Sequence, residues 1–253
     1  MIMRVDGHIV LITGGATGIG FALAEAFTRA GSEVILCGRR QTKLREAKSK
    51  IRSAHTRRCD VSTESERKKL LKWSTSNFPG LDILVNNAGI QRQVDFTSPK
   101  ISRRIPPAND EIAINLESTI RLCALFAPKF LAKKSAIILN VSSGLAFVPI
   151  AEMPIYCATK AAIHSFTTSL RHQLKDTSVS VFEAIPPTTD TELDASFAGE
   201  EEQGYRGISP QEVAAAIIDG LKVDKKEIII GQAQGLRKAS MENPEQIFNQ
   251  LNG

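Results

Sequence analysis

The sequence is poor in the features that mark secreted, membrane or metal-binding chains. Its four cysteines are scattered through 253 residues, and no pair stands at C-x-x-C spacing. Scattered cysteines favour reduced thiols over a disulfide framework or a zinc site. No apolar run is long enough to span a bilayer, and residues 1–7 lack the apolar segment of a secretory signal. We therefore expect a cytoplasmic protein with no membrane insertion.

Three further absences narrow the chemistry. None of the four histidines stands near carboxylates at metal-ligand spacing, so no metal site is predicted. We assign His164 and His172 to a helix surface or a subunit contact. No G-x-S-x-G elbow is present, which disfavours a serine hydrolase. Residues 39–58 hold nine Lys and Arg but one acid, Glu46. Without aromatic stacking patterns, a helix-turn-helix or zinc spacing, this basic stretch indicates a solvated helix face and not a nucleic-acid interface.

The chain alternates between short apolar runs and longer stretches with helical periodicity. Seven runs predict strands at residues 9–12, 33–37, 55–58, 81–85, 136–141, 179–184 and 227–230. Helices are expected at residues 21–29, 41–52, 62–77, 110–133, 155–175, from Ser209-Pro210 onward and at 244–251. This alternation favours the α/β class, as a Rossmann-type, doubly wound parallel seven-stranded sheet with helices on both faces. The length and the lack of a linker favour a single domain over residues 1–253, with a flexible flap at about 191–207.

A glycine-rich turn follows the first expected strand. Gly14, Gly18 and Gly20 stand at i, i+4 and i+6, directly before the helical stretch 21–29. Gly14 allows a tight reversal, Gly18 allows a pyrophosphate to approach the backbone, and Gly20 allows the helix to pack close to the sheet. The N–H groups and the dipole of the helix then face the anion. Three glycines alone are also compatible with an ordinary turn.

Charged residues follow the second and third expected strands. After the second strand of a dinucleotide fold, an acid binds the ribose 2′-OH, whereas an arginine accommodates a 2′-phosphate. This chain has Arg39 and Arg40 there, so NADP(H) is the preferred cofactor and NAD(H) the other possible one. The competing interpretation is that both arginines point into solvent. Asp60, after the third strand, either binds the exocyclic amine of adenine or caps the helix expected at 62–77.

Four polar side chains carry the predicted chemistry. Tyr156 and Lys160 are four residues apart on one expected helix and share a face. A cation beside a phenol lowers its pKa from about 10 towards neutral pH, as acid–base catalysis on an alcohol or a carbonyl requires. Ser143 follows the fifth strand and is able to donate a hydrogen bond to a carbonyl oxygen. Asn115 lies inside an expected helix, where it is either exposed or part of a polar network.

Together, these motifs resemble the short-chain dehydrogenase/reductase family in its single-domain form, and within it the bacterial oxidoreductases of the DltE type. The resemblance extends from about residue 8 to residue 230. It rests on Thr13-Gly14-x3-Gly18-x-Gly20, Asn86-Asn87-Ala88-Gly89, Asn115, Ser143 and Tyr156-x3-Lys160, which follow the family's order and approximate spacing. The family implies a nicotinamide cofactor, an oxidoreductase that interconverts an alcohol and a ketone or aldehyde, and a homodimer or homotetramer.

The resemblance also implies a role for each of these residues. Tyr156 is the expected proton donor or acceptor, Lys160 binds the nicotinamide ribose and lowers the pKa of Tyr156, and Ser143 orients the substrate oxygen. Asn115 holds a water molecule that links Lys160 to solvent. The implied cofactor-binding set comprises Gly14, Thr17, Gly18, Ile19, Gly20, Arg39, Arg40, Asp60, Val61, Asn87, Ala88, Gly89, Tyr156, Lys160, Pro186, Thr189 and Thr191.

One segment departs from the family pattern. After the sixth strand the family reads Pro-Gly-x-Val-x-Thr, whereas this chain reads Pro186-Pro187-Thr188-Thr189-Asp190-Thr191. Pro187 fixes φ and has no N–H group, so the contacts of the nicotinamide carboxamide at this point differ from those of the family.

The stretch between Ser143 and Tyr156 is expected to line the pocket of a small-molecule substrate. Its members are Leu145, Ala146, Phe147, Val148, Pro149 and Met153. Because residues 190–202 are acidic, we expect neutral, apolar ketones or aldehydes to be preferred over anions. The alternative function is a catalytically idle NADP(H)-binding protein that senses redox state or serves an interaction.

Overall fold

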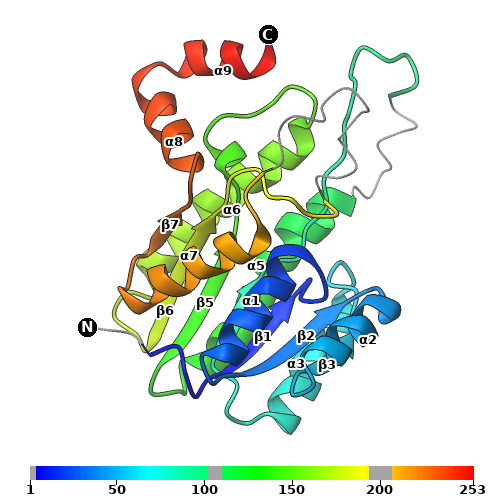
Figure 1. The fold of residues 1–253 in the computed structure, drawn as a ribbon, viewed down its shortest axis with the longest axis vertical. Coiled ribbons are helices and arrows are strands. Elements are labelled where there is room, and N and C mark those ends of the chain that lie inside the picture. Colours follow the sequence, from blue (N-terminus) through cyan, green and yellow to red (C-terminus); the bar gives the residue numbers. More distant parts are fainter. Residues whose placement is uncertain (1–3, 102–109, 194–206) are drawn as a thin grey trace.

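The computed structural model describes residues 4–101, 110–193 and 207–253. Within these residues, seven strands form one parallel sheet in the order β3-β2-β1-β4-β5-β6-β7 (Figure 1). The strands are β1 (Ile9–Thr13), β2 (Glu33–Gly38), β3 (His55–Arg58), β4 (Ile83–Asn86), β5 (Ala136–Val141), β6 (Val179–Ile185) and β7 (Glu227–Ile229). The predicted doubly wound parallel sheet is confirmed. Its order reverses between β1 and β4, and open α/β sheets bind ligands at such a point.

Helices cover both faces of the sheet. One face carries α1 (Gly18–Arg29), α2 (Gln41–Lys50) and α7 (Pro210–Lys222), and the other carries α3 (Glu64–Asn77), α5 (Ser118–Phe130) and α6 (Pro154–Gln173). Successive side chains of a strand point to opposite faces. Val10 and Ile12 therefore belong to the first core, and Leu11 between them belongs to the second. Burial on both faces explains why the strands are apolar without a polar alternation.

Three helical predictions differ from the structure. The helix expected from residue 62 begins at Glu64. The helix expected at 110–133 consists of a π-helix, η1 (Ile112–Glu117), followed by α5, which ends at Phe130. The sequence analysis missed α8 (Ala233–Glu242), which leads into the predicted α9 (Pro244–Asn252). Ala233 is the buried residue of α8, and the rest of this helix is partly or fully exposed.

Two expected surface segments lie partly outside the described residues. The loop expected at 91–107 is described as far as residue 101, and the flap expected at 191–207 is described at residues 191–193 and 207. Across the described parts of the chain, no helix has both the length and the apolar character needed to cross a bilayer.

Candidate active site

The glycine-rich turn between β1 and α1 has the backbone that its glycines were predicted to provide. Gly14 and Gly18 have φ values of +63° and +54°, which residues with a Cβ rarely adopt. At Gly20, a Cβ would overlap the carbonyl group of Gly14 and would lie 2.5 Å from Asn87 Nδ2. Gly20 therefore allows α1 to approach the end of the sheet, at the turn itself.

The start of α1 fits an anionic group such as a pyrophosphate. Because the helix begins at Gly18, the N–H groups of Gly18, Ile19 and Gly20 form its first turn and have no partner within the helix. The first turn contains no acid, and Thr17 precedes it in an extended conformation. This is the arrangement in which helix N-termini bind phosphate groups.

Thr13 fastens β1 to the end of β4. Its Oγ1 accepts the N–H groups of Asn87 (2.9 Å) and Ala88 (3.1 Å) and donates to the carbonyl of Val85 (3.2 Å). Asn87 Nδ2 in turn donates to the carbonyls of Thr13 and Gly14. The predicted residues Asn87 and Ala88 are thus held against the glycine turn. Thr13 begins the motif Thr13-Gly14-x3-Gly18-x-Gly20, but no role for its side chain was predicted from the sequence.

Asn115 is buried and belongs to a polar network, which is one of the two alternatives left open by the sequence. Its Oδ1 accepts the N–H of Ile90 at 2.9 Å, and its Nδ2 donates to the carbonyl of Ile90 at 2.8 Å and to Thr159 Oγ1 at 3.1 Å. It lies in η1, and a π-helical turn inside a helix frequently marks a functional site. Asn115 thereby joins the end of β4 to α6.

Lys160 lies beside this network. Its Nζ donates to the carbonyl of Val141 at 3.0 Å and lies 5.5 Å from the ring centroid of Tyr156. A Cβ at Gly89 would lie 3.7 Å from Lys160 Nζ and 3.4 Å from Asn115 Oδ1. Burial lowers the pKa of Lys160 to about 8, and the charge of Glu183 acts in the opposite direction. Lys160 is therefore a buried amine that titrates near neutral pH.

Ser143 and Tyr156 complete the predicted set. Both are buried, with exposed fractions of 8% and 6%. Ser143 follows β5, and its Oγ accepts the N–H of Leu145 at the start of the short helix η2 (Gly144–Ala146). Tyr156 lies in the first turn of α6. The four candidate catalytic residues thus come from η1, the end of β5 and α6, and Asn115, Lys160 and Tyr156 are linked by the contacts given above.

Two of the residues predicted for the substrate pocket pack with Tyr156, while the pocket itself stays a prediction. Met153 packs with Tyr156, and the partly buried Leu145 packs against them. Val148 is buried. Phe147 instead lies between two charged groups: its ring centroid is 5.1 Å from that of His164 and 5.5 Å from the Arg237 guanidinium carbon on α8. The sequence analysis, which missed α8, gave no sign of this contact.

At the opposite end of the glycine turn, Arg40 and not Arg39 makes the long-range contacts. Arg40 donates to Thr17 Oγ1 at 3.1 Å and to Glu192 Oε2 at 2.7 Å. Lys43 Nζ lies 3.2 Å from the other oxygen of Glu192. Arg40 is thus exposed and also paired with Glu192, so the choice between a solvent-directed and a phosphate-binding Arg39 and Arg40 stays open. In the described part of the chain, no atom lies within 4 Å of the Cβ position at Gly38, so the strand end is open.

The two roles considered for Asp60 have different outcomes. Its Oδ1 accepts the N–H and the hydroxyl of Ser62 at 3.0 and 2.6 Å, which forms a turn before α3. Thr63 is the N-cap of α3, so the prediction that Asp60 caps this helix is wrong. Val61 is buried next to this turn, and its carbonyl accepts a hydrogen bond from Arg67. Binding of adenine by Asp60 and Val61 stays a prediction.

The segment after β6 returns to the glycine turn. The carbonyl of Pro186 accepts the N–H of Gly144, and the buried Thr189 donates its hydroxyl to the carbonyl of Pro187. Thr191 lies 3.2 Å from the position of a Cβ at Gly18. The segment that holds Pro186, Thr189 and Thr191 therefore runs from the Ser143 side of the site to the glycine-rich turn.

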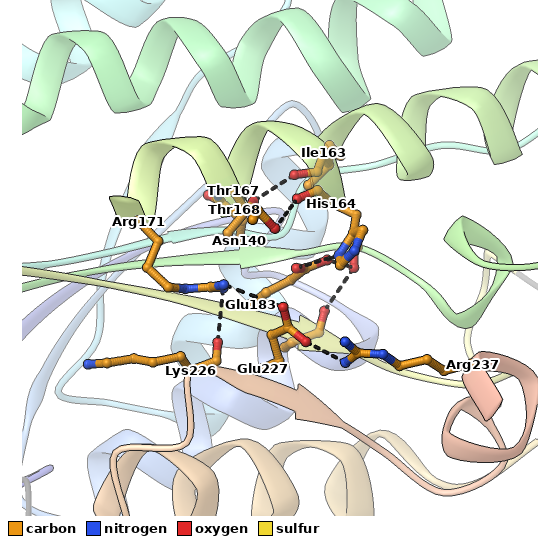
Figure 2. Close-up of polar contacts among 12 residues, drawn as sticks. Asn140, Ile163, His164, Thr167, Thr168, Arg171, Glu183, Lys226, Glu227 and Arg237 are labelled. Carbon is orange, nitrogen blue, oxygen red and sulfur yellow. Dashed lines mark hydrogen bonds and ion pairs between the residues drawn. The ribbon is translucent and has the colours of Figure 1, made fainter. Parts of the chain in front are cut away.

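A cluster of ionisable groups that was not predicted from the sequence lies next to Ser142, with one member, Glu183, fully buried. Glu183 of β6, His164 of α6 and Glu227 of β7 have ligand atoms within 4.8 Å of one another (Figure 2). Glu227 is paired with Arg171 and Arg237, and Glu183 is paired with His164, whose pKa this carboxylate raises. We therefore interpret the cluster as an ion-pair network. The sequence placed His164 on a helix surface or at a subunit contact; only the pairing of β6 with β7 brings two acids beside it.

Comparisons with known proteins agree with this geometry. The family model for short chain dehydrogenases matches residues 8–202. The uncharacterized oxidoreductase DltE of Bacillus subtilis (strain 168) is 44% identical over 250 residues, which cover 99% of this chain and 98% of that protein. The uncharacterized oxidoreductase SAR2567 of Staphylococcus aureus (strain MRSA252) is 30% identical over 220 residues, with 86% of this chain and 92% of that protein covered.

Solved structures share the fold. A short-chain dehydrogenase/reductase of Burkholderia phymatum in complex with NAD superposes with a TM-score of 0.82 at 21% identity, covering 99% of this chain and 98% of the other. A short-chain dehydrogenase of Burkholderia cenocepacia J2315 in complex with NADP superposes with a TM-score of 0.81 at 23% identity, covering 98% and 99%.

Proposed function

The chain belongs to the short-chain dehydrogenase/reductase family, and on this basis we propose that it is an NADP(H)-preferring oxidoreductase that interconverts a ketone or aldehyde and an alcohol. The observation that carries the proposal is that Lys160 lies between Tyr156 on one side and Asn115 and Gly89 on the other. A buried amine lies 5.5 Å from a phenol ring, and a buried amide network surrounds it. This is the environment that an acid–base tyrosine requires.

The residues fit a dinucleotide. Gly14 and Gly18 adopt backbone conformations open to glycine, Gly20 leaves no room for a Cβ, and the first turn of α1 presents free N–H groups. The nicotinamide supplies the hydride when the cofactor is bound. We assign the remaining binding contacts to Thr17, Asn87, Ala88, Gly89, Lys160, Pro186, Thr189 and Thr191.

Within this site, the protein moves one proton and orients one oxygen. Tyr156 Oη donates its proton to the carbonyl oxygen during reduction and accepts it back during oxidation. The ammonium of Lys160 favours the phenolate and so lowers the pKa of Tyr156. The Ser143 hydroxyl donates a hydrogen bond to the same substrate oxygen, and Asn115 holds the water through which Lys160 exchanges protons with solvent.

The preference for NADP(H) rests on the charges at the end of β2. Arg40 and Lys43 lie together near the end of β2, where both are paired with Glu192, and Gly38 leaves space for a phosphate. Charged hydrogen bonds to phosphate contribute about 1.5–3 kcal/mol each, which corresponds to one to two orders of magnitude in affinity. The similar proteins of Burkholderia were solved with NAD and with NADP, respectively.

We propose a neutral, apolar carbonyl compound as substrate, because Leu145 and Met153 pack with Tyr156. We further propose that the protein works in the cytoplasm as a homodimer or homotetramer, which light scattering after size exclusion tests directly.

The decisive experiment has two steps. Titration of NADPH and NADH into the purified protein measures both affinities, and we expect NADPH to bind at least tenfold more tightly. NADPH oxidation is then followed with uncharged alkyl and aromatic ketones and aldehydes, and with dicarboxylates as the anionic control. Tight NADPH binding with no turnover across the panel would support the catalytically idle alternative. Lack of binding of both cofactors would refute the proposal.

A further inference from the structure

Glu183 is a buried carboxylate that the proposed proton transfer does not use. It lies on β6 and is 0% exposed. Its Oε1 accepts a hydrogen bond from Ser142 Oγ at 2.5 Å, and its two oxygens lie 3.1 and 2.9 Å from His164 Nδ1. Figure 2 shows Glu183 between His164 of α6 and Glu227 of β7. Burial of a carboxylate has an unfavourable free energy unless the group is hydrogen-bonded or paired, so the partners of Glu183 indicate what it stabilises.

These contacts belong to a chain of interactions that runs from α6 to the end of β5, on to β6 and back to α6. On α6, Lys160 follows Tyr156 by one turn and His164 follows Lys160 by one turn, so the three share a face. Lys160 donates to the carbonyl of Val141, the last residue of β5. The next residue, Ser142, donates to Glu183, and Glu183 binds His164 and so returns to α6. Ser143, the residue after Ser142, is therefore attached to this chain of interactions.

We propose that Glu183 is a positioning residue that holds the end of β5 against α6 through Ser142 and His164, and so sets the place of Ser143 relative to Tyr156 and Lys160. The inference rests on the proposed function in taking these three as the catalytic groups. Backbone bonds support the same junction, since Ser142 N–H donates to the carbonyl of Ala184.

The charge of Glu183 has a second effect, on Lys160. Burial lowers the pKa of Lys160, and Glu183 raises it. The other charged groups around the cluster are balanced among themselves: Glu227 is paired with Arg171 of α6 and Arg237 of α8. His164 has a raised pKa because it is hydrogen-bonded to Glu183. Without Glu183, Lys160 would lose its proton at lower pH, and the support of the Tyr156 phenolate would weaken at neutral pH.

The test uses Glu183→Gln, which keeps the shape and removes the charge. Glu227→Gln is the matched control, because it makes the same change one strand away. In the cofactor-free protein with ¹³Cε-labelled lysine, NMR gives the titration midpoint of Lys160, whose signal is assigned by its loss in Lys160→Met. We expect the midpoint to fall by roughly one pH unit in Glu183→Gln and to stay unchanged in Glu227→Gln.

The kinetic arm uses a carbonyl that the wild type reduces. Glu183→Gln should lower kcat about tenfold or more at neutral pH, because small displacements of catalytic groups have large effects. Glu183→Asp should recover part of the loss and the wild-type Lys160 midpoint. Equal losses of kcat in Glu183→Gln and Glu227→Gln would overturn the positioning role, and equal midpoints in wild type and Glu183→Gln would overturn the effect on Lys160.

A further variant covers the case in which Glu183→Gln does not fold. Ser142→Ala keeps the carboxylate and removes the link to β5, so we expect a severalfold lower kcat with an unchanged Lys160 midpoint; a wild-type kcat would overturn the positioning role. The proposed function fails if the wild type neither binds NADPH nor reduces carbonyls. In that case the Lys160 midpoints of wild type and Glu183→Gln can still be compared, so the two failures are distinguishable.

Discussion

The two ends of the proposed site, one around Asn115 and Lys160 and the other around Arg40, differ in burial and in the interactions that stabilise them. At the catalytic end, Asn115 and Lys160 are 0% and 5% exposed, and backbone carbonyls accept hydrogen bonds from both. At the adenosine end, the side chains of Arg40 and Glu192 are 55% and 49% exposed. Buried hydrogen bonds are costly to break, whereas exposed ion pairs contribute about 0–1 kcal/mol.

We infer that the buried end keeps the catalytic groups in place, whereas the exposed end selects between the two cofactors. The catalytic groups are fixed by packing and by hydrogen bonds that do not depend on a ligand. Arg40 and Lys43, which we propose to bind a cofactor phosphate, form exposed ion pairs with Glu192 and are able to exchange partners at little cost. We therefore expect changes at the first end to reduce catalysis sharply, and changes at the second end to alter the preference between cofactors by smaller factors.

The largest expected effect is that of Tyr156→Phe. The variant keeps the ring and its packing against Met153 but removes the hydroxyl. Because general acid catalysis contributes about 10²- to 10⁴-fold, kcat/KM for carbonyl reduction should fall by that factor, while NADPH affinity stays within about twofold of wild type. Steady-state kinetics and a fluorescence titration measure the two quantities. Turnover close to that of the wild type would remove Tyr156 from the mechanism.

The next effect concerns the turn between the two ends. Gly20→Ala places a methyl group on the carbonyl of Gly14 and beside Asn87 Nδ2, so the backbone must shift. We expect a loss of about 1–3 kcal/mol in the free energy of unfolding, together with weaker binding of both cofactors. Gly235→Ala in α8 is the control: no described atom lies within 4 Å of its Cβ position, and alanine favours a helix. Equal unfolding midpoints for the two variants in urea would contradict this account of Gly20.

At the adenosine end, Glu192→Gln should sharpen the preference for NADPH. The substitution removes the ion pairs of Glu192 with Arg40 and Lys43, so both cations are available to bind a phosphate. In the wild type, hydrogen bonds with Glu192 and Glu46 raise the pKa of Lys43. Gain of one charged hydrogen bond corresponds to roughly tenfold tighter NADPH binding, with NADH affinity unchanged. Arg40→Ala should act in the opposite direction. Calorimetric titrations that find both cofactors affected equally would assign Glu192 no part in selection.

The smallest effect is a pH-dependent stability change at His164. The Glu183 carboxylate raises the pKa of His164 above its usual 6.5 in the folded protein. The stabilisation of the wild type relative to His164→Asn, about 1 kcal/mol, should be complete below pH 6.5 and should decline as pH rises through the higher folded-state pKa. Urea unfolding of both proteins across this range tests the sign. A difference that grows with pH would show that His164 is not charged in the pair.

Much of this protein was predictable because local spacing determines it. Alternating apolar runs specify a parallel α/β sheet, glycines with positive φ specify the turn before α1, and a four-residue separation places Tyr156 and Lys160 on one face. These patterns depend on the 2- and 3.6-residue periods of the backbone. They require no knowledge of which elements become neighbours.

What only the tertiary structure decided depends on distances between elements. Glu183 meets Ser142 because β5 pairs with β6, and it meets His164 because α6 packs across both. Likewise, Glu192 reaches Arg40 over 152 residues of sequence. Ion pairs and buried hydrogen bonds form where folding brings side chains within about 3 Å, and no periodicity encodes that approach.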